Sequence, residues 1–207
     1  MKPVISSLFL LLLLNGIAHT TDVVIKPASA SSSTEINATR SISDSLDGVL
    51  LSAGGTSNNI LEEVASYAGS NGHWLSAITS IDDDANFRST TEELIFTLGS
   101  PESISKVHIW PYIRAENIRG LKTFDISFSF DGGTSYPTTI SAASLGDFTI
   151  GPTGGTDAVQ TKSFSPQNNV THIKLTNLTS FGSTNYLALS EIRFGKIVPN
   201  GTIFKIE

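Results

Sequence analysis

The sequence predicts an all-β fold, an antiparallel β-sandwich, on three observations. Short apolar runs recur along the chain and are separated by stretches rich in Gly, Pro, Ser and Asp. One run, residues 124–130, alternates strictly between apolar and polar side chains, which is the period of a strand buried on one face. The most helix-like segment, residues 59–68, is short. Short strands joined by turn-rich loops favour an antiparallel sandwich.

The predicted strands follow one another through the second half of the chain. Residues 94–98 form an apolar run that ends at Gly99-Ser100-Pro101, and residues 107–110 form the next run after this turn. Residues 124–130 form the clearest strand, which stops at Asp131-Gly132-Gly133, where glycine tolerates the positive φ of a tight turn. Three further strands are predicted, at residues 159–164, 172–175 and 187–194.

The N-terminal segment predicts export. A lysine at the second position precedes the uncharged apolar run of residues 8–14, and small residues favour cleavage after Ala18, with Thr20 as the alternative position. We therefore predict a signal peptide over residues 1–18 and a secreted or cell-surface location. Polar residues interrupt the run of residues 4–17, which falls short of the about 20 apolar residues of a membrane span. No integral membrane segment is expected after cleavage.

The remaining chain has the length of one domain. Residues 19–35 contain a Ser- and Ala-rich run and predict a flexible leader. The β-sandwich is assigned to residues 36–195, and residues 196–207 are assigned to a C-terminal tail. The sequence has no cysteine, so export brings neither a disulfide framework nor a catalytic thiol.

Charge and motif content favour binding over catalysis. The formal net charge is −6 and basic residues do not cluster, which argues against nucleic acid as a partner. The sequence contains no Gly-x-Ser-x-Gly elbow, no His-Glu-x-x-His zinc motif and no phosphate-binding glycine loop. We therefore predict a protein that binds its target without transforming it.

A series of short motifs, taken in order, resembles the coagulation factor 5/8 type C (discoidin) family of galactose-binding-like domains. The motifs are Trp74-Leu75-Ser76, residues 94–99, Val107-His108-Ile109-Trp110-Pro111-Tyr112, Arg119-Gly120-Leu121-Lys122, Ser129-Phe130-Asp131-Gly132 and Leu189-Ser190-Glu191-Ile192-Arg193-Phe194. Where one subset of the family has "WNYN" and then "NRG", this chain has Trp110-Pro111-Tyr112-Ile113 and Ile118-Arg119-Gly120. The resemblance covers residues 36–195. It implies a jelly-roll sandwich whose loops at one end bind glycans, glycoproteins or phospholipid head groups.

The resemblance implies a ligand site on three loops at one end of the sandwich. The candidate ligand-binding residues are His73, Trp74, Arg114, Asn117, Arg119 and Tyr186. Guanidinium and amide groups suit the recognition of sugar hydroxyl groups, and a tyrosine ring offers a surface for stacking. The residue types alone also allow a structural interpretation, in which Trp74 and Trp110 are buried aromatics and Arg119 pairs with a carboxylate.

The family commonly holds a structural calcium ion between its first strands and a glutamate of its last strand. Glu191 matches this glutamate, and Asp47 is the upstream candidate. Asp47 lies well before Trp74, whereas the family usually places "DG" shortly before its tryptophan. Calcium takes about six to eight oxygen ligands, many of them backbone carbonyls that a sequence does not reveal. Asp47 and Glu191 are therefore the predicted metal ligands and Ca²⁺ is the expected cofactor.

The leading functional hypothesis is a secreted, non-catalytic module that recognises carbohydrate on glycans or glycoproteins. The alternative is a structural or adhesive extracellular protein that uses the same sandwich for protein–protein contacts. An extracellular enzyme that acts on polysaccharides comes third, because two carboxylates far apart in sequence can meet in a folded chain.

Overall fold

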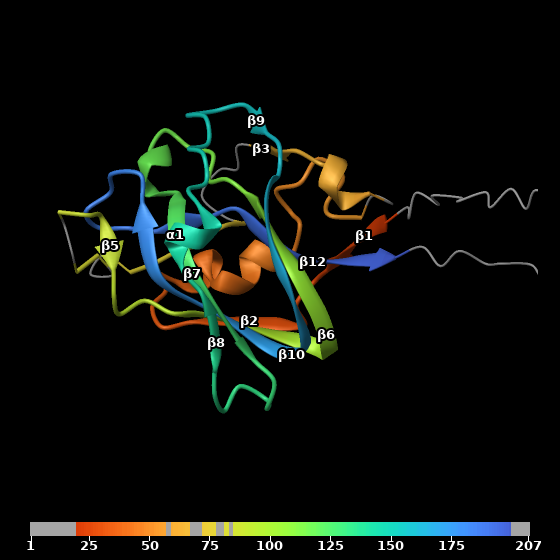
Figure 1. Cartoon of the computed structure of the whole chain (residues 1–207). Helices are drawn as coiled ribbons and strands as arrows, with labels where there is room; N and C mark the ends of the chain where they lie inside the picture. Colours follow the sequence, from red (N-terminus) through yellow and green to blue (C-terminus); the bar gives the residue numbers. More distant parts are fainter. Residues whose placement is uncertain (1–19, 57–58, 67–71, 78–80, 83–84, 200–207) are drawn as a thin grey trace, which may run out of the picture.

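An eight-stranded antiparallel sheet is the main element of the fold (Figure 1). The structure, a computed structural model, describes residues 20–56, 59–66, 72–77, 81–82 and 85–199. The sheet has the strand order β1-β12-β6-β10-β7-β8, with β2 paired to β6 and β5 paired to β10, and two small sheets, β11-β4 and β3-β9, accompany it. The predicted all-β antiparallel fold is confirmed.

Most elements are short, and two strands are long. The strands are β1 Thr20–Ile25, β2 Ser29–Ser32, β3 Ala65–Ser66, β4 Trp74–Leu75, β5 Arg88–Ser89, β6 Leu94–Trp110, β7 Leu121–Ser129, β8 Thr138–Ile140, β9 Thr156–Asp157, β10 Gln160–Ser180, β11 Ala188–Leu189 and β12 Glu191–Pro199. The helical turns are η1 Ala38–Arg40, η2 Ile42–Leu46, η3 Ile60–Glu62, η4 Asn117–Arg119 and α1 Ala142–Leu145. The helix-like segment of residues 59–68 thus forms only η3 and β3 where the structure describes it.

The long strands β6 and β10 correct the predicted strand breaks. β6 continues through Gly99-Ser100-Pro101, where the sequence predicted a turn, and β10 joins two segments that were predicted as separate strands. The register between them shifts three times, at places between Ser163 and His172. At a register shift some residues lie outside the hydrogen-bonded ladder, so turn-forming residues can occur there without ending the strand. The breaks predicted from Gly and Pro are therefore irregularities within continuous strands.

The strand with the strongest alternation forms as predicted. β7 covers most of residues 124–130 and pairs with β10 along one side and β8 along the other. The turn that follows has Gly132 and Gly133 at φ 77° and 85°, the left-handed region that glycine occupies at low cost.

The predicted flexible leader is wrong for the residues that form β1 and β2. β1 pairs with β12 from Thr20 to Ile25, and β2 pairs with β6 from Ser29 to Ser32. A strand ladder is made of backbone N–H and C=O groups, so a Ser-rich run can pair as well as an apolar one. The flexible leader predicted from composition is therefore wrong over these two strands.

A buried carboxylate also anchors the chain after β2. Glu92 is 1% exposed, and its Oε1 accepts hydrogen bonds from Ser32 Oγ at 3.1 Å and from Thr34 N at 3.2 Å. The Thr34 hydroxyl donates to Oε2 of the same carboxylate. Buried hydrogen bonds to a carboxylate are stronger than neutral ones, so Glu92 holds this segment against the domain.

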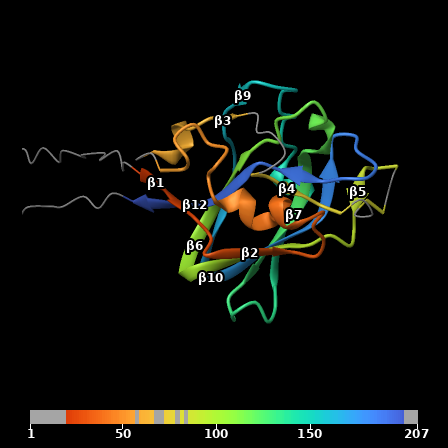
Figure 2. The same cartoon turned by 180° about the vertical axis from the view of Figure 1, so that it is seen from behind.

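The described ends of the chain lie side by side. β1 and β12 form a two-stranded ribbon that projects from the body of the domain (Figure 2). Residues 196–199 belong to β12, which corrects the predicted tail over that part. The predicted signal peptide and residues 200–207 lie outside the described residues. Within the described residues, no helix is long and apolar enough to cross a membrane.

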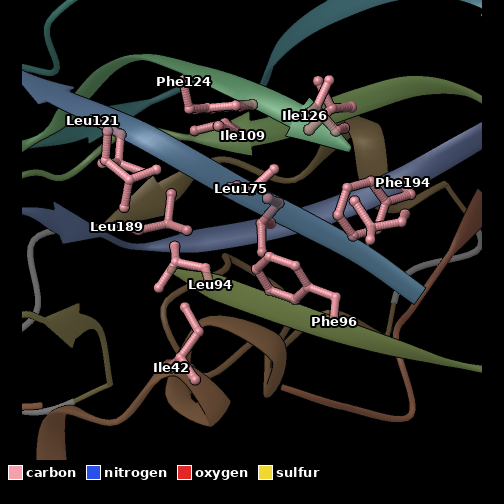
Figure 3. Close-up of a cluster of buried hydrophobic side chains, with 14 of the residues drawn as sticks. Ile42, Leu94, Phe96, Ile109, Leu121, Phe124, Ile126, Leu175, Leu189 and Phe194 are labelled. Carbon is pink, nitrogen blue, oxygen red and sulfur yellow. The ribbon is translucent and has the colours of Figure 1, made fainter. Parts of the chain in front are cut away.

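The main hydrophobic core lies between the long strands and η2. Ile42 of η2 points toward Leu94 and Phe96 of β6 (Figure 3). Phe96 and Phe194 of β12 meet edge to face, with ring centroids 5.4 Å apart, a favourable arrangement for two aromatic rings. This core supports the loops at the end of the sheet where β6 leads into η4.

Candidate functional site

Hydrogen bonds join the η4 loop to two other loops at one end of the sandwich. The Asn117 side chain in η4 donates from Nδ2 to Gly151 O at 2.5 Å. The backbone N–H of Phe181 donates to Ile118 O at 2.9 Å, which joins η4 to the loop of residues 180–187. These three loops are thus held together without a regular sheet.

Serine hydroxyls shape the loop of residues 180–187. Ser180 Oγ accepts from Ser183 N at 2.9 Å and donates to Ser183 O at 3.0 Å. Ser183 Oγ in turn accepts from Tyr186 N at 3.0 Å. Short polar side chains of this kind replace the backbone hydrogen bonds of regular structure in turns. Tyr186 is thereby presented at a defined position beside η4.

We call Arg114, Glu116, Asn117, Arg119 and Tyr186 the loop-end cluster. The Arg119 guanidinium carbon lies 4.7 Å from the centroid of the Tyr186 ring, a cation–π contact. Glu116 Oε2 lies 4.0 Å from both Arg114 Nε and Arg119 Nη1. The side chains of Arg114, Arg119 and Glu116 are 20%, 26% and 47% exposed, so solvent reaches all three. Exposed ion pairs add little stability, so their main effect is to orient the charged groups.

Tyr112 lies buried behind the loop-end cluster. Its side chain is buried, and its ring centroid lies 5.1 Å from that of His73. Burial raises the pKa of the Tyr112 hydroxyl, and the charges of Arg114 and Arg119 oppose this rise. The phenol therefore stays neutral at physiological pH. Tyr186 packs against the same small apolar cluster as Tyr112.

His73 and Trp74 are buried, which corrects their place among the predicted ligand contacts. His73 is 1% exposed and Trp74 is 0% exposed. The Trp74 indole packs in the main core and donates from Nε1 to Ser32 Oγ at 3.2 Å. A ring with no exposed face cannot stack on a ligand, so the structural interpretation of Trp74 applies. His73 contacts Tyr112 behind the loop-end cluster.

The two predicted calcium ligands lie close in the fold but point to different partners. Glu191 is fully buried, and its Oε2 accepts from Gly48 N at 2.9 Å, while Arg193 Nη1 donates to its Oε1. Asp47 is exposed, and its Oδ1 accepts from Val49 N at 2.8 Å. Both oxygens of Glu191 thus face N–H donors.

The donor set at Glu191 does not fit a calcium ion. Arg193 Nη2 donates to Leu46 O at 2.9 Å and Nη1 donates to Ile192 O at 2.7 Å, so the guanidinium that contacts Glu191 already occupies these two carbonyl oxygens. A second cation there would meet a positive charge in a buried site. Among the described residues, no group of three or more His, Asp or Glu side chains is arranged to hold a metal. Calcium bound by Asp47 and Glu191 therefore stays a prediction that the arrangement of these donors does not support.

Sequence reasoning missed three of the residues that build these sites. Tyr112 follows Trp110 in a motif that was noted only as a family likeness, and Glu116 lies within the loop that was expected to bind ligand. Arg193 had a usable signal, because residues two apart on a strand share a face. Glu191 and Arg193 therefore meet on one side of β12.

No family model and no curated protein sequence matches the chain. Solved structures do match it. The family 32 carbohydrate-binding module of NanJ from C. perfringens, in complex with galactose, has a TM-score of 0.51 and 17% identity, over 85% of this chain and 100% of that one. Another family 32 module from Clostridium perfringens, in complex with GalNAc-β-1,3-galactose, has a TM-score of 0.50 and 15% identity, over 83% and 99% of the two chains.

An F5/8 type C domain from Bacteroides fragilis is also similar, with a TM-score of 0.50 and 15% identity, over 81% of this chain and 90% of that one. Identities this low establish the fold alone. The protein therefore has the β-sandwich fold of family 32 carbohydrate-binding modules and F5/8 type C domains, and the resemblance found in its sequence is confirmed at the level of the fold.

Proposed function

We propose that this protein is a secreted, non-catalytic module that binds carbohydrate through the loop-end cluster. The observation that carries the proposal is the Arg119 guanidinium held over the Tyr186 ring, beside Arg114 and Glu116, on loops fixed by their own hydrogen bonds. Pre-oriented side chains lose less conformational freedom on binding, which favours affinity for a small ligand.

The chemistry of the loop-end cluster suits a sugar. Guanidinium groups donate several hydrogen bonds in a plane, and the Glu116 carboxylate is a hydrogen-bond acceptor. Neighbouring hydroxyl groups of one sugar therefore find both a donor and an acceptor. The half-buried Tyr186 ring adds apolar contact for the C–H groups of a sugar. Galactose and GalNAc-β-1,3-galactose, the ligands of two similar structures, are the first to test.

One observation supports binding without catalysis, and a second supports a location outside the cell. The loop-end cluster contains one carboxylate, Glu116, whereas most glycoside hydrolases use a pair. The pattern of residues 1–18 is that of a signal peptide.

A glycan array, followed by calorimetry on the best ligands, tests the proposal. We expect binding to galactose-containing glycans, and we expect Arg119→Ala and Tyr186→Ala each to weaken it about tenfold or more, the effect of losing one good contact. Lys122→Ala is the control, because Lys122 is a surface cation paired with Asp147 outside the cluster. A silent array, or variants that bind like the wild type, would reject the proposal and favour protein–protein contact instead.

A further inference from the structure

A groove on the side of the sheet is separate from the loop-end cluster. It lies between β8 and the start of α1 on one side and the first half of β10 on the other, and its volume is about 450 Å³. Its lining includes Thr139, Ile140, Ser141, Ser163, Phe164 and Gln167. Neither η4 nor residues 180–187 contribute to it. Cavities of about 300–1,000 Å³ commonly hold small ligands.

The floor of the groove is apolar and its rim carries hydroxyl groups. Ile140 and Phe164 are half-buried and pack against the main core, and the Phe164 ring lies 5.5 Å from that of Phe128 between centroids. Ser141 and Ser163 are exposed at the rim. The groove thus places one aromatic ring beneath a ring of polar groups.

The polar groups at the rim are partly held in place and keep hydrogen-bonding capacity. Thr139 Oγ1 lies 2.8 Å from Ser127 Oγ. Gln167 donates from Nε2 to Ser165 O at 2.9 Å. A primary amide has a second N–H and a carbonyl oxygen beyond the one donor used here. A ligand with several hydroxyl groups can bond to such an amide as both donor and acceptor.

None of the described residues that line the groove carries a charge. The uncharged lining favours a neutral ligand over a charged one. A phosphate or carboxylate ligand would find no cation, and the basic side chains that bind nucleic acid are missing from this lining. A neutral sugar, by contrast, offers C–H groups to the Phe164 ring and hydroxyl groups to the rim.

We propose that this groove is a second carbohydrate-binding surface, which takes a neutral oligosaccharide independently of the loop-end cluster. The inference rests on the proposed function for the class of ligand, and on the groove itself for the place. Two surfaces on one module engage a long polysaccharide together, and the second contact then forms at a high effective concentration.

Nuclear magnetic resonance titration of the exported chain locates binding residue by residue. The probes are neutral oligosaccharides of β-linked galactose, glucose and mannose. We expect the backbone amides of residues 139–144, 163–165 and 167 to shift with at least one probe, and to shift equally in the Arg119→Ala variant. Ser163→Arg, which adds bulk and charge at an exposed rim position, should weaken this binding about tenfold. Thr153→Arg, at an exposed loop position outside the groove lining, is the control.

The outcomes separate the two proposals. Shifts confined to residues 113–120 and 181–186, or Ser163→Arg binding as tightly as the wild type, would overturn the groove and leave the loop-end cluster intact. Shifts confined to the groove would support the groove and count against the loop-end cluster. No shift in residues 139–144, 163–165 or 167 with any of the three probes would overturn this inference.

Discussion

Replacing Arg193 by alanine removes a buried cation that joins the last strand to the η2 loop. The guanidinium is 2% exposed and contacts Glu191, Leu46 O and Ile192 O. In the Arg193→Ala variant, the Glu191 side chain keeps only the Gly48 N–H as a partner among these contacts. The variant therefore tests whether Arg193 connects the loop to β12 in place of a metal ion.

The expected loss of stability follows from these contacts. Removing one partner of a buried ion pair costs about 3–5 kcal/mol, because the other charge is left without compensation. Burial already raises the pKa of Glu191, so an unpaired Glu191 takes up a proton and avoids part of this cost. We therefore expect a loss of about 3 kcal/mol, the lower end of the range.

Urea unfolding followed by tryptophan fluorescence measures this loss, because Trp74 and Trp110 are both buried in the folded state. The wild-type midpoint should be the same in excess calcium and in a chelator. Lys122→Ala, which removes an exposed cation, should change stability by less than about 1 kcal/mol. A chelator that lowers the wild-type midpoint, or an Arg193→Ala loss below about 1 kcal/mol, would refute the reasoning.

Three further predictions concern buried polar groups and close packing. Burial lowers the pKa of the His108 imidazole to about 4, below its unfolded value. The contribution of His108 to the free energy of unfolding is therefore complete above about pH 6.5 and is lost as pH falls toward 4, a change of about 3 kcal/mol. A His108→Gln variant should show a flatter dependence of the urea midpoint on pH. A Cβ at residue 195 would lie 2.5 Å from His108 Nε2, so Gly195→Ala should lower stability by about 1–3 kcal/mol in thermal unfolding, while Gly154→Ala, with open space around it, should not. Glu92→Ala should speed hydrogen exchange over residues 29–34, and unchanged exchange there would show that Glu92 does not anchor this segment.

Part of the loop-end cluster could be predicted from the sequence. Arg114, Asn117, Arg119 and Tyr186 were named as ligand contacts, and the structure brings these four side chains or their loops together. Their ability to bind sugar stays a prediction. The groove beside Phe164 had no signal in the sequence, because serines and threonines are common throughout this chain and only the fold gathers some of them around one ring.

The sequence by itself determined the features that depend on neighbouring residues. The alternation in β7 and the turn at Gly132 and Gly133 follow from the period of a strand and the freedom of glycine, and both are local properties. The order of the motifs also identified the sandwich fold. Each single motif in that order lies within a few residues of the chain.

Only the tertiary structure decided the features that join distant segments. The Ser-rich β2 became a strand because β6 offers it backbone partners and Glu92 accepts its hydrogen bonds. Trp74 is a core residue because the fold encloses its ring, and Arg193 is the cation beside Glu191 because its guanidinium reaches Leu46 O. Burial and long-range hydrogen bonding belong to the folded chain, and the pattern of residue types does not specify which distant groups will meet.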